Sequence, residues 1–153
     1  MSFTELKVLH EELNELFLRH QEALLGGDLA LAASRLDSYE EALRAHIELE
    51  EKDLMSIYRW AGRIPGGPEE FFTGEHAKLL EMLNRCRTSL EEIGREVGSP
   101  NRGIIRLFDL EAAFKSLTEH HHQREENIFF PALDRVATDE EKQAILDVNR
   151  KGA

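Results

Sequence analysis

The chain has 153 residues, 41% hydrophobic and 32% charged, which suits one domain with a real core and excludes a disordered chain or a membrane-spanning protein. The net charge of −11 argues against nucleic acid and anionic membranes as partners, because both are bound through basic residues. A single cysteine, Cys86, and a polar N-terminus without a secretory region predict a cytoplasmic protein.

The first half contains two segments with the apolar spacing of amphipathic helices. The first helix is predicted from about Thr4 to Gly26, and Asp28 is a good N-cap for the second. The second helix should end before the glycine- and proline-rich residues 62–68. The short turn between the two helices predicts an antiparallel hairpin.

The second half repeats this organisation. A third helix is predicted to end near Gly94, and residues 98–103 have the composition of a turn. A fourth helix is predicted to end around Pro131, because proline cannot continue a helix interior. Residues 138–141 read Thr-Asp-Glu-Glu, a capping box that begins a short fifth helix at about 138–150.

No segment alternates as a half-buried strand does, so the chain is predicted to be all-α. Four long helices with short turns predict an antiparallel up-and-down four-helix bundle, about residues 3–134, followed by the short C-terminal helix. The chain from 1 to 153 is predicted to form a single domain. The fifth helix either covers the bundle or mediates dimerisation, which leaves a monomer and a homodimer both open.

Each half carries the same chemical motif, a histidine followed one helical turn later by two glutamates. The two copies are His46, Glu50, Glu51 and His121, Glu125, Glu126. Residues four apart share a helix face, so an imidazole and a carboxylate in this spacing suit a metal held inside a bundle. An earlier histidine lies on the apolar stripe of each half, His10 in the first and His76 in the second.

Helix geometry predicts that four histidines reach one level of the bundle. With a rise of about 1.5 Å per residue, His10 lies about 24 Å before the first turn and His46 about 27 Å after it. His121 lies about 27 Å beyond the second turn, and His76 a similar distance before it. His20 is only about 9 Å from the first turn, which excludes it from this level.

Helix phase distinguishes the three consecutive histidines 120–122. The apolar stripe of the fourth helix continues to His121, Glu125 and Ile128. His122 continues a polar face, so it is placed with Glu126 around the ligands or on the surface, and residue 120 is intermediate. Whether residues 120, 122 or 126 contact the metal directly is left open.

The predicted metal ligands are His10, His46, Glu50, His76, His121 and Glu125. Burial of these groups without partners would cost roughly several kcal/mol each, which a metal avoids. Nitrogen and oxygen ligands without a thiolate favour iron or manganese over structural zinc. Two bridging glutamates and a bridging solvent oxygen would give each of two metals about five ligands and leave one octahedral position for a small molecule.

These residues resemble the hemerythrin-like, or HHE cation-binding, family over about residues 3–134. The resemblance rests on the paired His-x-x-x-Glu-Glu motifs, the second closing on Phe130-Pro131, and on His10 and Glu75-His76. It implies two non-haem irons with a bridging oxo or hydroxo group, manganese or zinc as substitutes, and dioxygen, nitric oxide or peroxide as the small-molecule ligand. Oxygen-carrying hemerythrins have His-x-x-x-His on their third helix, whereas Leu80 stands four residues after the histidine here.

The leading functional prediction is a non-haem di-iron protein that binds or senses dioxygen or a related small ligand. The first alternative is an enzyme that turns over peroxide or nitric oxide on the same centre, or a protein of iron homeostasis or iron-centre repair. No dedicated general acid or base is evident, so enzymatic activity is left open. The second alternative is a metal-free helical interaction module.

Several other polar residues have two interpretations. Glu51, Glu75, Glu126 and His122 either orient the metal ligands or belong to a solvated face. His20 is expected to be a satisfied or partly exposed histidine, and the cysteine is expected to be a small core residue.

Overall fold

The computed structural model describes residues 1–151, and all regular structure in this range is helical, which confirms the all-α class. The elements are η1 (Phe3–Leu6), α1 (Lys7–Leu25), α2 (Leu29–Glu48), η2 (Leu49–Leu54), α3 (Met55–Tyr58), η3 (Arg59–Ala61), α4 (Glu69–Arg95), α5 (Asn101–Arg124), η4 (Glu125–Phe129), α6 (Phe130–Val136) and α7 (Asp139–Lys151). Within these residues no helix combines the length and the apolar character that crossing a bilayer requires.

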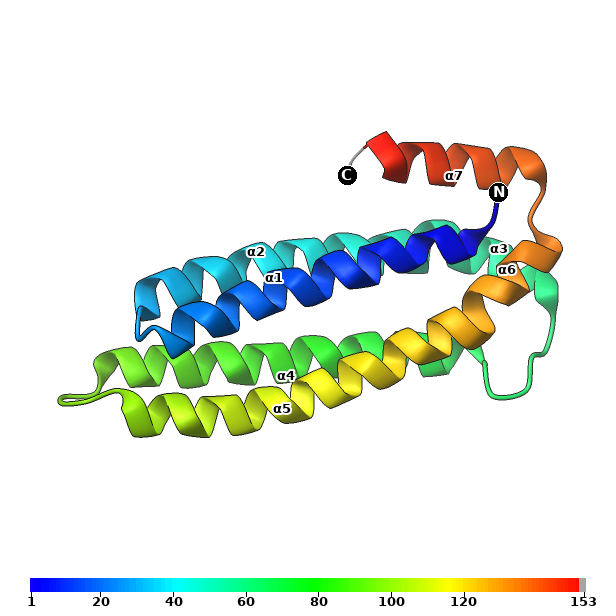
Figure 1. Ribbon diagram of the computed structural model, residues 1–153. Helices are drawn as coiled ribbons and strands as arrows, with labels where there is room; N and C mark the ends of the chain where they lie inside the picture. The colour runs from blue at the N-terminus through cyan, green and yellow to red at the C-terminus, as the bar shows by residue number, and fades with distance from the viewer. Residues whose placement is uncertain (152–153) are drawn as a thin grey trace.

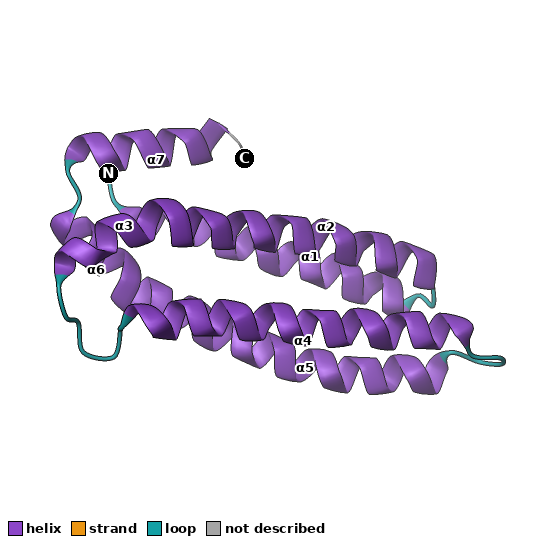
Figure 2. Cartoon of the chain, turned by 180° about the vertical axis from the view of Figure 1, so that it is seen from behind, coloured by secondary structure: helices purple, strands orange, loops and turns teal. Residues whose placement is uncertain are grey.

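Four long helices lie alongside one another as two hairpins (Figure 1). The first hairpin is α1 and α2, joined at Gly26 and Gly27, and the second is α4 and α5. Gly27 has a φ of 75°, which glycine adopts without strain, and Asp28 caps α2 as predicted by accepting the N–H of Leu31 at 3.0 Å. The hairpins face each other through contacts of α2 with α4 and of α1 with α5, and Figure 2 shows the same pairs from behind.

Apolar side chains fill the interior in two clusters. The larger cluster, which includes Leu13, Phe17, Leu83 and Phe114, occupies the half of the long helices next to the two hairpin turns. The other cluster lies at the opposite end and gathers residues of η1, α3, α6 and the start of α4. Between them, every long helix or its continuation contributes buried histidine or glutamate, so the candidate site is enclosed by apolar layers on both sides.

The C-terminal helix α7 begins at the predicted capping box. Glu141 donates its backbone N–H to the Thr138 hydroxyl at 3.1 Å, and Thr138 donates its N–H to the Glu141 carboxylate at 2.8 Å. Leu146 of α7 is buried in the cluster that contains Phe3, so the helix covers the end of the molecule where the chain starts (Figure 1).

Two helix ends differ from the sequence prediction. Helix α5 begins at Asn101, before the predicted turn ends, and Gly103 is buried inside it against Ile93. The fourth helix also does not stop at Pro131, because the π segment η4 is followed by a new α-helix, α6, which begins at Phe130 and has Pro131 in its first turn. Proline is tolerated in the first turn of a helix, where its missing N–H needs no partner.

Candidate metal centre

Six buried side chains of the predicted ligand set meet between the two apolar clusters. They are His10 of α1, His46 of α2, Glu50 of η2, His76 of α4, His121 of α5 and Glu125 of η4. The first hairpin and its continuation therefore supply two histidines and a glutamate, and so do the second hairpin and its continuation. We call these six residues the polar layer.

Both glutamates of the polar layer belong to π turns at matching places in the two halves. The backbone carbonyl of Glu50 accepts the N–H of Met55, and that of Glu125 accepts the N–H of Phe130, so each turn contains one residue more than an α-helical turn. The added residue shifts the buried stripe, so Phe129 is buried in place of the predicted Ile128, which is only half-buried. π turns of this kind recur at functional sites.

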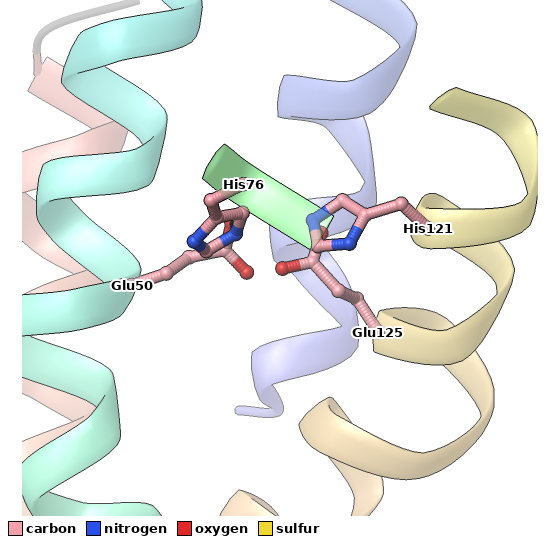
Figure 3. A group of neighbouring side chains, drawn as sticks. All are labelled: Glu50, His76, His121 and Glu125. Atoms are coloured by element: carbon pink, nitrogen blue, oxygen red, sulfur yellow. Dashed lines mark ion pairs between the residues drawn. The ribbon is translucent and has the colours of Figure 1, made fainter. Parts of the chain in front are cut away.

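Ligand atoms of the polar layer form two groups in which all the atoms lie within 4.8 Å of one another. One group contains Glu50, His76, His121 and Glu125, whose side chains point toward one another in Figure 3. The other contains His10, His46 and Glu125. Glu125 belongs to both groups, and each group could hold a metal ion.

The two glutamate side chains lie between the histidines of opposite hairpins. Oε1 of Glu125 is 2.9 Å from Nε2 of His10, 3.6 Å from Nε2 of His46 and 3.4 Å from Nε2 of His121. Oε1 of Glu50 is 2.8 Å from Nε2 of His46 and 3.4 Å from Nε2 of His76. A carboxylate in this position can contact ions on both sides.

Many buried polar atoms of the layer have no hydrogen-bond partner among the described residues. They are Nδ1 and Nε2 of His46, Oε1 and Oε2 of Glu50, Nε2 of His76, Nε2 of His121 and Oε2 of Glu125. Native interiors contain few such atoms, because each unmet hydrogen bond costs roughly 1–3 kcal/mol. Imidazole nitrogens and carboxylate oxygens are donors to iron, manganese or zinc, so the donor set fits a metal.

The pKa shifts of three of these groups also suit metal ligation. Burial lowers the pKa of His10 and of His121, which favours neutral imidazoles. Burial alone would raise the pKa of Glu50, but the nearby imidazoles of His46 and His76 hold it well below its usual range. For His76, burial lowers the pKa, but neighbouring carboxylates, Glu50 foremost, raise it overall.

Three glutamates outside the polar layer each accept a hydrogen bond from Nδ1 of one of its histidines. Nδ1 of His10 donates to Glu126 at 2.8 Å, Nδ1 of His76 to Glu51 at 2.6 Å, and Nδ1 of His121 to Glu75 at 2.9 Å. A carboxylate fixes the ring in the tautomer whose Nε2 lone pair faces the interior. Of the two interpretations left open by the sequence, the structure therefore supports an orienting role for residues 51, 75 and 126.

The structure identifies Arg124 as a residue that sequence reasoning missed. Its guanidinium donates through Nε to both oxygens of Glu75, at 3.1 and 3.2 Å, and through Nη1 to the carbonyl of Gly66 at 2.7 Å. It also lies 5.0 Å above the ring centre of Phe71. No sequence pattern marks this residue, because its partners lie about fifty residues earlier on another helix and its preceding loop.

The other three histidines have different surroundings. His122 was predicted around the ligands or on the surface, and it is buried with its ring stacked on that of His10. His120 is exposed and contacts Arg124. His20 is fully buried away from the layer, where Nδ1 donates to the Ala32 carbonyl at 2.8 Å and Nε2 lies 2.6 Å from Glu111.

Comparison with known proteins gives one match. The model of the hemerythrin HHE cation binding domain matches residues 67–151, which is more than half of the chain. No curated protein and no solved structure matches.

Proposed function

Because the chain belongs to the hemerythrin HHE cation-binding domain family, we propose that it holds two non-haem iron ions and binds or senses dioxygen or a related small ligand. The proposal places the polar layer inside an up-and-down four-helix bundle formed by α1, α2, α4 and α5. One observation carries it: buried imidazole nitrogens and carboxylate oxygens that lack a hydrogen-bond partner in the described part of the chain converge at one level from both hairpins.

Each residue of the polar layer has a defined part in this proposal. His10 and His46 hold one ion, His76 and His121 hold the other, and Glu50 and Glu125 lie between them. Two bound irons would supply reversible redox chemistry and an open coordination position. The apolar clusters on both sides keep bulk water from the layer, and the outer carboxylates hold the rings in their binding tautomer.

Metal analysis after anaerobic reconstitution tests the proposal. The metal-free protein should take up about two ferrous ions per chain, and exposure to air should produce visible absorption that reduction removes. At free metal near one hundred times Kd, each bound ion should stabilise the fold by about 2.7 kcal/mol, which raises Tm by roughly 5–10 °C.

Substitution of Glu125 by Ala should abolish iron binding, since this carboxylate contacts histidines of both hairpins. Glu81→Ala is the matched control, because Glu81 is exposed and its ion-pair partner within the described part of the chain is Arg85, one turn later on α4. Wild-type protein that binds no iron, with an unchanged Tm, would refute the proposal and favour a metal-free interaction module.

A further inference from the structure

A groove of about 500 Å³ lies between α1 and α5, beside the polar layer. Its floor consists of buried side chains, and its rim consists of side chains that are exposed or half-buried. A volume of this size is typical of sites that hold small organic molecules, roughly 300–1,000 Å³. The floor residues are His10, Phe17, Tyr39, Phe114, Thr118 and His122.

The three aromatic rings of the floor pack against one another. The ring centre of Phe17 is 5.0 Å from that of Tyr39 and 5.2 Å from that of Phe114, and the rings of Tyr39 and Phe114 are 6.0 Å apart. Aromatic rings at these separations attract through offset or edge-to-face contacts, and a further flat ring can join such a cluster. The floor therefore favours an aromatic occupant over an aliphatic one.

His122 supplies a polar contact on this floor. Its side chain is only 6% exposed, and one face of its ring is covered by the ring of His10. The two ring nitrogens have no hydrogen-bond partner among the described residues, and the ring lines the groove. A neutral imidazole offers one N–H donor and one acceptor nitrogen. Because buried polar groups in proteins nearly always have partners, these nitrogens indicate an occupant of the groove that supplies them.

The lysines and glutamates of the groove all lie on its rim. The rim contains two lysines, Lys7 and Lys115, and three glutamates, Glu11, Glu119 and Glu126. The floor has no carboxylate, amine or guanidinium of its own to pair with a charged ligand. Burial of a charge without a partner is costly, so an uncharged occupant fits the floor best.

We propose that this groove binds an uncharged aromatic alcohol, with its ring against Phe17 and Phe114 and its hydroxyl hydrogen-bonded to His122. A hydroxyl both donates and accepts, so it can pair with either tautomer of the imidazole. No metal takes part in these contacts. The inference therefore stands or falls separately from the proposed di-metal function.

Fluorescence titration of the full chain with 2-naphthol tests this inference, because this two-ring alcohol is fluorescent and uncharged at pH 7.5. We expect one saturable site per chain, both in the protein as isolated and after metal is removed with a chelator. Naphthalene lacks the hydroxyl and should bind roughly 3–10-fold more weakly, since one hydrogen bond is lost. The anion 2-naphthoate should also bind more weakly than 2-naphthol.

Two neighbouring histidines provide matched variants. His122→Phe keeps a flat ring but removes both nitrogens, so it should weaken the binding of 2-naphthol by roughly 3–10-fold and leave that of naphthalene unchanged. His120→Phe is the control, because His120 is exposed, contacts Arg124 and does not line the groove. This variant should bind 2-naphthol as the wild type does. Circular dichroism and melting establish that each variant is folded.

NMR titration of the wild-type protein locates the site without any variant. On addition of 2-naphthol, the signals of Phe17, Thr118 and His122 should shift, whereas those of Glu81 on the exposed face of α4 should not. Shifts confined to other parts of the chain would overturn the inference. This measurement decides the question even if His122→Phe does not fold.

Several outcomes of the titrations would also overturn the inference. They are the absence of saturable binding, equal affinities for 2-naphthol and naphthalene, and equal losses in the two histidine variants. Tighter binding of 2-naphthoate would overturn the uncharged occupant. Metal content is measured separately, so a protein that binds 2-naphthol but no iron would keep this inference and refute the di-metal function.

Discussion

The imidazole of His122 stacks on that of His10, with ring centres 3.9 Å apart and planes inclined by only 4°. Both rings are buried, but only His10 lies against carboxylates of the motif, at its two ring nitrogens. Burial lowers the pKa of His122 to about 2, and nearby histidines add to the effect, so this ring stays neutral. We therefore expect the two stacked rings to have different roles: His122 packs in the core, and His10 is a proposed metal ligand.

Phenylalanine at each position should separate these tasks. His122→Phe preserves a flat, uncharged ring, so we expect the iron content to stay near the wild-type value. His10→Phe preserves the shape but removes both nitrogens, so we expect at least one iron per chain to be lost. Elemental analysis of the two reconstituted variants provides the measurement. Loss of iron in His122→Phe alone would instead make His122 the ligand.

The polar layer should destabilise the metal-free protein. Replacing His46 by Leu and Glu50 by Met together removes a buried pair whose atoms lack proper hydrogen bonds. Apolar replacement of such pairs stabilises proteins by up to about 4 kcal/mol, so the free energy of unfolding of the metal-free variant should rise. Urea unfolding in the presence of a chelator measures it. A clear decrease would mean that the pair stabilises the fold without metal.

The buried pair of His20 and Glu111 should behave in the opposite way. Both ring nitrogens of His20 have partners, and Glu111 also accepts from Gln21 at 3.0 Å. His20→Leu leaves a buried carboxylate without its main partner, which should lower the free energy of unfolding by about 3–5 kcal/mol. Iron content should not change, because His20 lies roughly three helical turns from His10. Loss of iron in a folded variant would contradict this separation.

Two glycines inside helices should respond to alanine with opposite signs. A Cβ at Gly103 would lie 2.8 Å from Cγ1 of Ile93, closer than packed atoms allow, so Gly103→Ala should destabilise the protein by about 1–3 kcal/mol. A Cβ at Gly74 would meet nothing within 4 Å, so Gly74→Ala should stabilise by up to about 1 kcal/mol. Thermal unfolding of both variants gives the comparison, and equal shifts would argue against close packing at residue 103.

The thiol of Cys86 should be unreactive in the native protein. The side chain is fully buried, and burial, together with the nearby carboxylate of Glu111, raises the pKa of Cys86 to about 12. The reactive thiolate is therefore scarce at any pH below that value. A colorimetric thiol reagent at pH 8 should label the denatured chain quickly and the native protein only slowly. Rapid native labelling would mean that the core opens there.

Local rules predicted the starts of α2 and α7 and the inward direction of the six candidate ligands, because caps and helical phase depend on neighbouring residues. Asp28 and Thr138 cap the helices as expected, and all six predicted residues are buried in one layer. Phase failed beyond Glu125, where Phe129 is buried in place of Ile128, because a π turn adds a residue that no propensity rule signals. The stacking of His122 on His10 was not predicted, for a different reason.

The sequence of α5 alone could not predict how many of its residues are buried. Glu111, Lys115, Thr118 and His122 follow one another on a polar stripe, yet all of them except Lys115 are buried. Glu111 is covered because His20 and Gln21 of α1 bind it. A polar stripe predicts exposure only when no partner helix supplies matching groups, and the partner here lies about ninety residues away.

The chain passes from one hairpin to the other through the segment 62–68, which contains solvent-exposed residues such as Arg63 and Pro65. Each side of this segment carries two of the proposed histidine ligands and one glutamate, so neither half alone has the complete set. A chain cut at this segment would leave two fragments joined by their apolar contacts and, when metal is present, by coordination across the interface. If association of the two fragments depends on metal, the amount of associated fragment would report the concentration of available metal.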